Sequence, residues 1–387
     1  MKILSADKKN SVEDEIRSVF SSALLGWYDR SGRDLPWRVR GAHPNPYIVW
    51  AAEIMLQQTT VKTVIPYFYR FMEKFPDIQT LAEADIEGVL LMWQGLGYYT
   101  RARKLHECAK YLTANRDGKF PETYAELLKL PGIGPYTAAS ISSLAFDKRE
   151  AVVDGNVIRV ISRLYGILET VSLPDIQKKA QNLMPEKRAA DYTSAIMDLG
   201  AVVCTPKNPN CGSCPFQENC AALRNGMIDK IPLIQKLQKT GKTGKVFWIE
   251  NETGGVFIQK RTEKGLLHGL TEFPWSAVVD SGDNSGGDKS DGVNESGSVS
   301  FPIAGDWTDT GKSVRHVFTH IRLELHIFKI RLSKEAEASF LNQNSGFFVP
   351  ESAFSDFPFS TLMKKIILEV SKQDPPKKGI PTLSDYF

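Results

Sequence analysis

Three features are missing from this sequence of 387 residues, and each absence narrows the class of protein. No run approaches the roughly 18 apolar residues that span a membrane, so a membrane protein is not expected. The chain opens MKILSADKKN without an apolar signal stretch, which predicts a cytoplasmic location. A large charge of one sign is also missing, because the net charge is only +3. Affinity for a polyanion would therefore have to come from local basic and backbone N–H sites.

Cysteine is scarce as well, but four of the five cysteines lie close together, at Cys204, Cys211, Cys214 and Cys220. Four thiolates so close in sequence can surround one soft metal centre, either zinc or an iron–sulfur cluster. Disulfides are disfavoured because cytosolic thiols stay reduced. Common zinc ribbons pair two C-x2-C knuckles, and only Cys211 and Cys214 form one here, which favours a [4Fe-4S] cluster. Cys108, within KLHECAKYL, is expected in a helical core.

The hydrophobic pattern changes along the chain. Apolar residues recur at three- and four-residue intervals from Val12 to about Arg224, which predicts helices. From Lys245 the period becomes two, and KVFWIE and VFIQKR on either side of Gly254-Gly255 predict a β-hairpin. We therefore expect a mostly α N-terminal region followed by an α+β C-terminal domain. The expected segments are a helical region at 1–225, a linker at 226–244, a second domain at 245–372 with a disordered loop near 280–300, and a flexible tail at 373–387.

Two glycines in LPGIGPYTAASI, Gly132 and Gly134, indicate a tight hairpin before a helix of small residues. Such a hairpin lets the backbone approach a phosphate, and the N-terminus of the following helix offers free N–H groups. This is a helix-hairpin-helix signature, although glycine spacing alone also suits an ordinary turn between helices.

Two carboxylates stand in contrasting surroundings. Glu53 lies in the apolar helix WAAEIMLQQTTV, where desolvation should favour its neutral form and suit a general acid. Asp154 precedes the helix GNVIRVISRLY and should stay ionised as its N-cap. Taken alone, each also fits a structural role, as a satisfied buried glutamate and an ordinary helix cap.

Together, the hairpin, Asp154 and the cysteine spacing resemble the helix-hairpin-helix-GPD superfamily of DNA glycosylases, from about Leu35 to Cys220. Within it the chain is most similar to the MutY family of adenine glycosylases, which share a Glu-bearing helix followed by Leu-Gln-Gln-Thr and an extra C-terminal domain. The resemblance implies a six-helix barrel with a [4Fe-4S] domain, followed by a nudix/MutT-like domain. Endonuclease III-like relatives, which also cut the backbone, carry a nucleophilic lysine where Tyr136 stands here.

The resemblance also implies a monofunctional mechanism of base-excision repair. Glu53 would protonate the flipped adenine, Asp154 would support the sugar cation, and Tyr136 would orient these carboxylates. The residues implied in base and DNA binding are Trp37, Arg38 and Asp198 at the adenine pocket, Leu56, Gln57, Gln58 and Tyr98 at the base stack, and Gly132 and Gly134 at phosphate. Arg101, Arg103 and Lys104 also look like phosphate contacts, although a basic run is more often a solvated helix face.

The second domain carries GLLHGLTEFPW, which resembles a nudix element, but it lacks the Glu-rich helix of nudix hydrolases. Phe318, Thr319 and His320 stand where the MutY family reads 8-oxoguanine, unless they simply continue a strand. The final residues 380–387 resemble a sliding-clamp peptide. The implied partner is duplex DNA with adenine opposite 8-oxoguanine or guanine, bound by a monomer in the nucleoid. The rival functions are an endonuclease III-like lyase on oxidised pyrimidines and a non-catalytic mismatch-binding protein.

Overall fold

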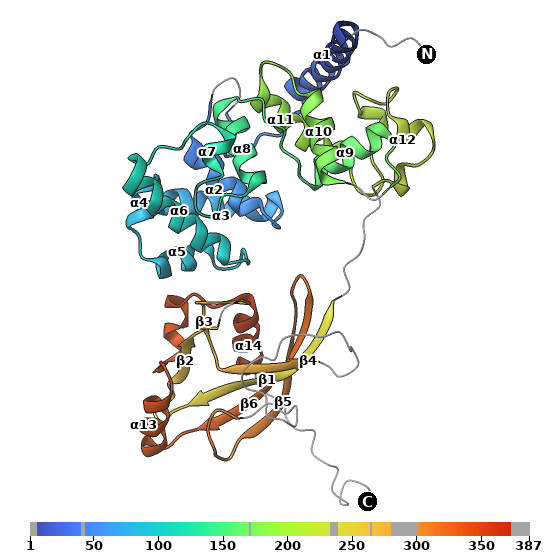
Figure 1. Cartoon of the computed structure of the whole chain (residues 1–387). Helices are drawn as coiled ribbons and strands as arrows, with labels where there is room; N and C mark the ends of the chain where they lie inside the picture. Colours follow the sequence, from blue (N-terminus) through green and yellow to red (C-terminus); the bar gives the residue numbers. More distant parts are fainter. Residues whose placement is uncertain are drawn as a thin grey trace, which may run out of the picture. The chain divides into compact units, whose positions relative to one another are not determined.

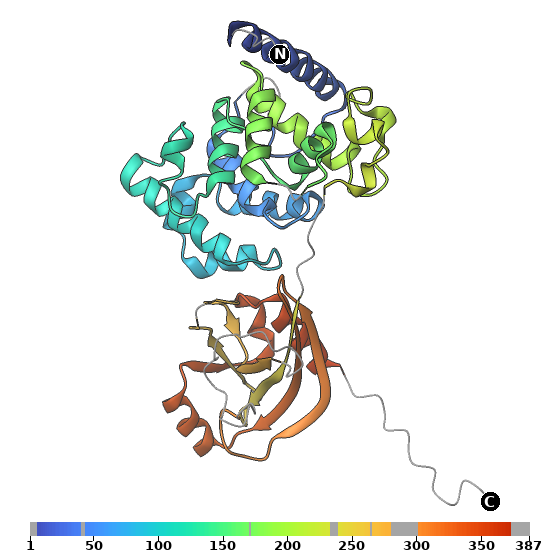
Figure 2. The same cartoon turned by 45° about the vertical axis from the view of Figure 1, so that its right-hand side comes forward.

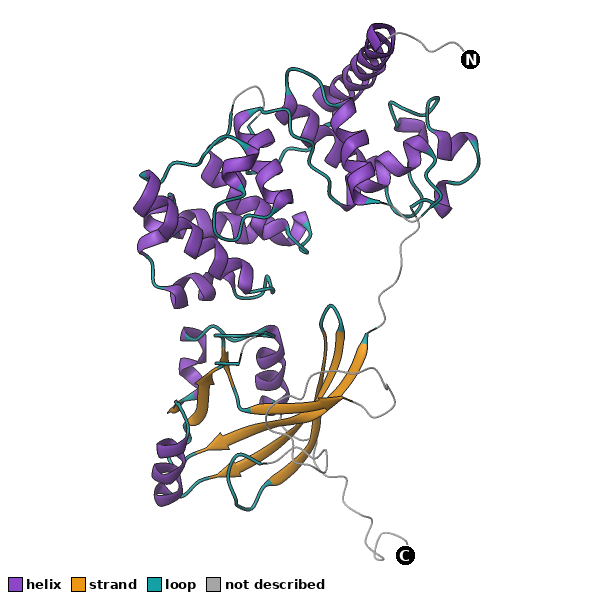
Figure 3. Cartoon of the chain, in the orientation of Figure 1, coloured by secondary structure: helices purple, strands orange, loops and turns teal. Residues whose placement is uncertain are grey.

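The computed structural model describes residues 6–39, 43–169, 172–232, 239–263, 265–279 and 301–372. Contacts divide the chain into two compact units, Met1–Val89 with Thr100–Gln235 and Leu90–Tyr99 with Lys236–Phe387. Within the described ranges, every strand follows residue 239, so the earlier part of the chain is helical and the later part combines strands with helices (Figure 3). The loop expected near 280–300 and the tail with the candidate clamp peptide lie outside the described residues.

Helices make up the described chain as far as residue 230, as the hydrophobic pattern predicts (Figure 1). They are α1 (Ala6–Ser31), α2 (Pro46–Leu56), α3 (Val61–Lys74), α4 (Ile78–Glu83), α5 (Ile86–Trp93), α6 (Thr100–Arg116), α7 (Tyr124–Leu127), α8 (Pro135–Phe146), α9 (Gly155–Tyr165), α10 (Leu173–Leu183), α11 (Ala189–Asp198), the π-helix η1 (Leu199–Val203), the short η2 (Cys211–Ser213), α12 (Ala221–Arg224) and η3 (Ile228–Lys230). None of the described helices is both long and apolar enough to cross a membrane.

One core of the first unit joins helices from both ends of its sequence. Leu24 of α1, Ile161 of α9 and Ala195 of α11 are completely buried in it. The long helix α1, dark blue in Figures 1 and 2, contacts α10 and α11. Cys108 is completely buried in α6, as expected for a core cysteine.

The predicted hairpin connects α7 to α8. Gly132 has a φ of +73°, and a Cβ atom there would lie 2.5 Å from Cβ of Lys104, so both the backbone conformation and the space require glycine. Gly134 is the N-cap of α8 with Pro135 in the first turn. A Cβ atom at Gly134 would meet nothing within 4 Å, so open space rather than packing surrounds this glycine.

The second unit contains a mixed seven-stranded sheet in the order β3-β2-β1-β6-β5, with β4 paired to β1 and β7 to β2. The strands are β1 (Thr240–Glu250), β2 (Val256–Lys260), β3 (Thr271–Glu272), β4 (Trp275–Val279), β5 (Thr308–Val317), β6 (Ile321–Arg331) and β7 (Gly346–Val349). The helices are α13 (Lys334–Gln343), the short η4 (Glu351–Asp356) and α14 (Thr361–Ser371).

Apolar side chains of β1 point alternately to the two faces of the sheet, and both faces are covered by a core. Val246 and Trp248 share a core with residues of α14, whereas Phe247 and Ile249 share another with Phe340 of α13. The β1–β2 hairpin is antiparallel as predicted, and buried residues alternate with more exposed ones along most of β6. Strand β1 begins at Thr240, inside the expected linker, because residues 240–244 pair with β6.

Candidate active site

Glu53 lies on α2, whose first turn is set by Pro46 and by the side chain of Asn45, which accepts a hydrogen bond from the backbone N–H of Tyr47. Only 4% of Glu53 is exposed. Burial raises the pKa of Glu53, the charge of Asp154 raises it further, and a hydrogen bond from Tyr136 opposes the change without cancelling it. The carboxyl group is therefore biased toward its protonated form.

Tyr136 lies in the first turn of α8, directly after the hairpin. Its hydroxyl donates a hydrogen bond of 2.8 Å to Oε2 of Glu53. Burial and the nearby charges of Glu53 and Asp154 raise the pKa of Tyr136 well above its ordinary value. The hydroxyl consequently keeps its proton and serves as a donor to the carboxyl group.

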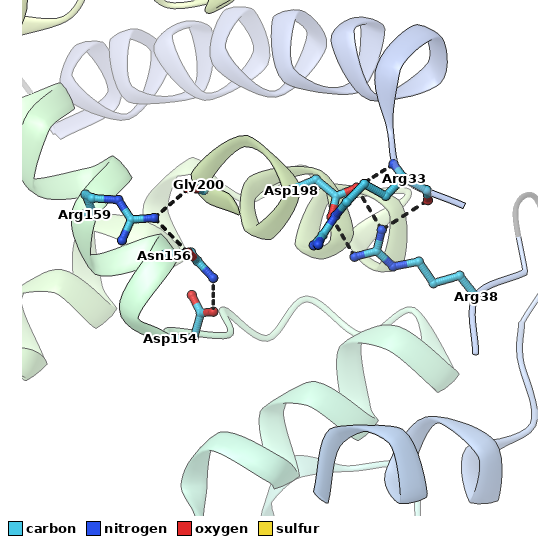
Figure 4. Close-up of polar contacts among 7 residues, drawn as sticks. All are labelled: Arg33, Arg38, Asp154, Asn156, Arg159, Asp198 and Gly200. Carbon is cyan, nitrogen blue, oxygen red and sulfur yellow. Dashed lines mark hydrogen bonds and ion pairs between the residues drawn. The ribbon is translucent and has the colours of Figure 1, made fainter. Parts of the chain in front are cut away.

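Asp154 is the N-cap of α9, as predicted. Its Oδ1 accepts a hydrogen bond of 2.7 Å from the backbone N–H of Val157, and its Oδ2 accepts one of 2.8 Å from Asn156. Asn156 in turn accepts a hydrogen bond from Arg159, whose guanidinium also donates to the carbonyl of Gly200 (Figure 4). The same guanidinium donates to the carbonyl of Cys204. These contacts fix the carboxylate through the backbone and one amide side chain.

A cavity of about 710 Å³ gathers these groups within the first unit. Glu53, Tyr136 and Asp154 all line it, together with Asn156. Its walls also include most of the residues expected at the base pocket and the base stack, namely Trp37, Arg38, Leu56, Gln57 and Gln58. The space is large enough for a nucleobase and part of a sugar.

Asp198, expected at the base pocket, is completely buried behind Arg38 and is not among the residues that line the cavity. Its carboxylate accepts hydrogen bonds from Nη1 and Nη2 of Arg38, at 2.8 and 2.9 Å, and from the backbone and side chain of Arg33 (Figure 4). Burial alone would raise the pKa of Asp198, but the hydrogen bonds and charges of both arginines outweigh it and lower the pKa. The geometry makes Asp198 an anchor for Arg38.

The four clustered cysteines form no disulfide in the described structure, and all are half-buried around the segment from η1 to α12. Burial raises the pKa of Cys214 to about 11, and the charges of the other three thiols add to it, so the four groups are neighbours. Arg163 donates to Sγ of Cys204 at 3.4 Å, and Sγ of Cys220 lies 3.4 Å from the Arg163 carbonyl.

Comparison with known proteins shows which family this chain belongs to. Residues 51–186 match the HhH-GPD superfamily of base excision DNA repair proteins. The adenine DNA glycosylase of Rattus norvegicus is 34% identical over 403 residues, covering 90% of this chain and 77% of that protein. The chain belongs to the adenine DNA glycosylase family. The enzyme of that name from Buchnera aphidicola of Schizaphis graminum is 40% identical over 261 residues, covering 66% of this chain and 74% of the relative.

The fold agrees with membership of the adenine DNA glycosylase family. The solved structure of a thermostable thymine-DNA glycosylase is 29% identical, with a TM-score of 0.50, and covers 55% of this chain and 98% of that one. Residues 245–369 match a NUDIX domain. The predicted fold class, a helical helix-hairpin-helix region followed by a nudix-like α+β domain, is therefore confirmed.

Residues 204–220 match the iron-sulfur binding domain of endonuclease III, which confirms the expected [4Fe-4S] cluster. The described residues contain no group of three or more His, Cys, Asp or Glu side chains spaced to hold a single metal ion. Thiolates that bind a [4Fe-4S] cluster each ligate a different iron, so they need not converge on one point. Burial and the neighbouring Cys204 and Cys220 raise the pKa of Cys211, and the charge of the buried Arg163 offsets part of this rise.

The remaining residues expected to bind DNA are not among those that line the cavity. Tyr98 is exposed, with a φ of 49°, in the loop after α5. Phe318, Thr319 and His320 form the turn between β5 and β6, closed by a backbone hydrogen bond of 2.8 Å from Phe318 to Ile321, so the strand alternative is wrong. Thr319 and His320 are exposed on this turn.

Arg33 and Asn156 also contribute to the candidate site, although the sequence alone does not single them out. Arg33 lies five positions before Arg38 and binds the same carboxylate. Asn156 follows Asp154 by two positions, a spacing typical of a side chain that can reach back to a helix cap. Both signals are local, but neither is specific enough to assign a role without the structure.

Proposed function

We propose that this protein hydrolyses the N-glycosidic bond of adenine in duplex DNA, where adenine stands opposite 8-oxoguanine or guanine. The observation that carries the proposal is the meeting of Glu53, Tyr136 and Asp154 at one cavity of base size. A stacked adenine hides its glycosidic bond, so the nucleotide has to rotate out of the helix and into this cavity.

Glu53 acts as the general acid. Its raised pKa favours the protonated form, and that proton passes to the adenine ring, at N7. Protonation lets the base accept the electron pair of the breaking C1′–N9 bond and leave as neutral adenine. The positive charge then remains on the sugar as an oxocarbenium-like cation.

Asp154 supports that cation, either by its charge or by transient covalent capture at C1′. Both oxygens of Asp154 accept hydrogen bonds from N–H groups, which hold this side chain in the wall of the cavity. Water then attacks C1′, its proton passes to the Glu53 carboxylate, and an abasic site remains. Tyr136 holds Glu53 and has no amine for a Schiff base, so the backbone is not cut.

The base pocket is formed by Trp37 and Arg38. Trp37 is buried and stacks edge-on against Phe68, with ring centroids 5.4 Å apart, which presents a fixed aromatic wall. Arg38 is held by Asp198, so its position is set before the base arrives. Gly132 and Gly134 approach the phosphates through the exposed hairpin, and Leu56, Gln57 and Gln58 enter the base stack with Tyr98.

The second unit reads the opposite base through the turn of Phe318, Thr319 and His320. Phe318 packs against His316, with ring centroids 4.5 Å apart, which steadies one end of the turn. The exposed Thr319 and His320 offer a hydroxyl and an imidazole to the edge of 8-oxoguanine. Release of adenine is then the task of the helical region at 1–225, and recognition of the opposite base is the task of the domain at 245–372. The linker at 226–244 joins them. The protein acts as a monomer in the nucleoid, and clamp binding by residues 380–387 stays a prediction.

The test is adenine release from three duplexes, with adenine opposite 8-oxoguanine, guanine or cytosine. The proposal expects fast release from the first, slower release from the second and little from the third. Borohydride trapping of the protein on an oxidised pyrimidine would support the lyase alternative instead. Tight binding to the mispair without any release of adenine would support the mismatch-binding alternative.

A further inference from the structure

The C-terminal end of α2 is closed by an arginine from another helix. The last carbonyls of any helix lack partners within the helix and need donors from elsewhere. Here Nη1 of Arg101, at the start of α6, donates to the carbonyls of Ile54, Met55 and Gln57 at 2.7, 2.9 and 2.5 Å. A cation at this end also interacts favourably with the helix dipole.

The segment that follows, residues 56–60, forms a wall of the cavity and is called the wedge loop below. Its Gln58 has a φ of 60°, in the left-handed region that costs about 1 kcal/mol for a residue other than glycine. Such a conformation persists only when the surroundings hold it. Nη2 of Arg101 lies 3.4 Å from Oγ1 of Thr59, and Gln57 donates to Oγ1 of the buried Thr137 at 3.2 Å.

A basic residue beside a DNA-binding loop would ordinarily be assigned to phosphate, and the sequence suggests this for Arg101. The structure favours another role, because Nη1 of this half-buried guanidinium donates to three protein carbonyls. Lys104, one turn further along α6, differs clearly. Its side chain is 48% exposed and pairs only with the exposed Glu107 in the described structure.

We propose that Arg101 is a positioning residue that braces the wedge loop, so that Gln57 and Gln58 are already placed to fill the gap left by a flipped base. It acts through the backbone of residues 54–57 and not through a phosphate. The kinetic part of this inference rests on the proposed function, because the wedge matters only if a base is flipped. The structural part concerns the free protein alone.

Arg101→Lys tests the brace while keeping the positive charge, and Lys110→Gln, which removes an exposed charge from the same helix, is the control. We expect single-turnover adenine release to fall at least about 10-fold in Arg101→Lys, with affinity for undamaged duplex and its salt dependence unchanged. If Arg101 contacts a phosphate instead, Arg101→Gln should bind every duplex more weakly. The slope of log binding constant against log salt concentration should then also be smaller in magnitude by about one. That result, with wild-type rates at saturating protein, would overturn the proposal.

Hydrogen exchange in the free protein separates this inference from the proposed function. Amides of residues 57–60 should exchange at least about 10-fold faster in Arg101→Lys than in wild type, while the amides of α9 keep their protection. Thr59→Ala, which leaves the helix carbonyls capped, should give a smaller increase at the same amides. Unchanged exchange in both variants contradicts the brace. A wild-type protein that releases no adenine contradicts the proposed function, whatever the exchange shows.

Discussion

The hydroxyl of Tyr136 donates a hydrogen bond of 2.8 Å to the carboxyl of Glu53 and joins the hairpin helix to the apolar helix α2. These residues are 83 positions apart, and nothing in the local sequence of either one requires the contact. The hairpin segment therefore has two roles. Its exposed glycines are available to phosphate, and Tyr136 in the helix that follows orients the carboxyl group of Glu53. The protonation of Glu53 therefore depends on the hairpin as well as on burial.

Replacing Tyr136 with Phe removes this hydrogen bond and little else. The bond lowers the pKa of Glu53 against the effect of burial, so its loss should raise that pKa further. Glu53 would stay protonated to higher pH, so the alkaline limb of the rate profile should shift to higher pH. The maximum rate should fall about 10-fold, because the carboxyl group loses its orienting partner. Single-turnover rates measured across pH check this. A shift of the alkaline limb to lower pH would show that Tyr136 does not lower the pKa of Glu53.

Glu53→Gln should stabilise the fold. Burial raises the pKa of Glu53 above its ordinary value of 4.5, so the folded state holds this proton more tightly than the unfolded state. The stability that Glu53 contributes is present below pH 4.5 and is lost as pH rises through the folded pKa. Gln does not titrate, so the variant should exceed wild type by about 1–3 kcal/mol above the folded pKa. Denaturant unfolding at several pH values measures the difference, and a gap that fails to grow with pH contradicts the burial argument.

Asp198→Asn should destabilise the first unit by about 3 kcal/mol, because it leaves the charges of Arg33 and Arg38 without their buried partner. The pKa of Asp198 lies below its ordinary value of 3.8, so the wild-type advantage should vanish as pH falls through the folded pKa. Glu107→Gln, which breaks an exposed pair, should change stability by less than about 1 kcal/mol. If both variants lose an equally small free energy of unfolding, Arg33 and Arg38 must find other hydrogen-bond partners when Asp198 is replaced.

Arg163→Met should weaken the iron–sulfur cluster. Burial raises the pKa of Cys211, and the positive charge of Arg163, buried beside Cys204 and Cys220, opposes that rise and favours the thiolates that bind iron. We expect lower iron content and faster loss of the visible cluster absorption under chelation, while α13 and α14 keep their amide protection. Arg163→Lys, which keeps a positive charge, should lose less iron. Full iron content in the Met variant would contradict the role.

Features that depend on local sequence could be predicted well. The N-cap at Asp154, the left-handed Gly132, the β1–β2 hairpin and the alternation of β6 each follow from a few adjacent residues. The buried state of Glu53 follows from the apolar helix around it. In each case, propensity, pattern and burial favour the same conformation.

Features that depend on distant pairing could not be predicted. Asp198 carries no sequence signal that it binds Arg33, which lies 165 positions away, so an anchor is indistinguishable from a pocket residue. Arg101 is basic and near a DNA-binding segment, and only the structure shows that its guanidinium turns inward to carbonyls 44 to 47 positions earlier. Parallel pairing places Thr240 beside Ile321 and extends β1 into residues that by composition look like a linker.

The central claim is that Glu53 is the acid that releases adenine. Its most direct test is single-turnover release from a duplex with adenine opposite 8-oxoguanine, comparing wild type with Glu53→Gln at saturating protein. Gln keeps the size of the side chain and lacks the proton, so release should fall by about 10²–10⁴-fold while the duplex stays bound. Release at the wild-type rate by Glu53→Gln would contradict the account.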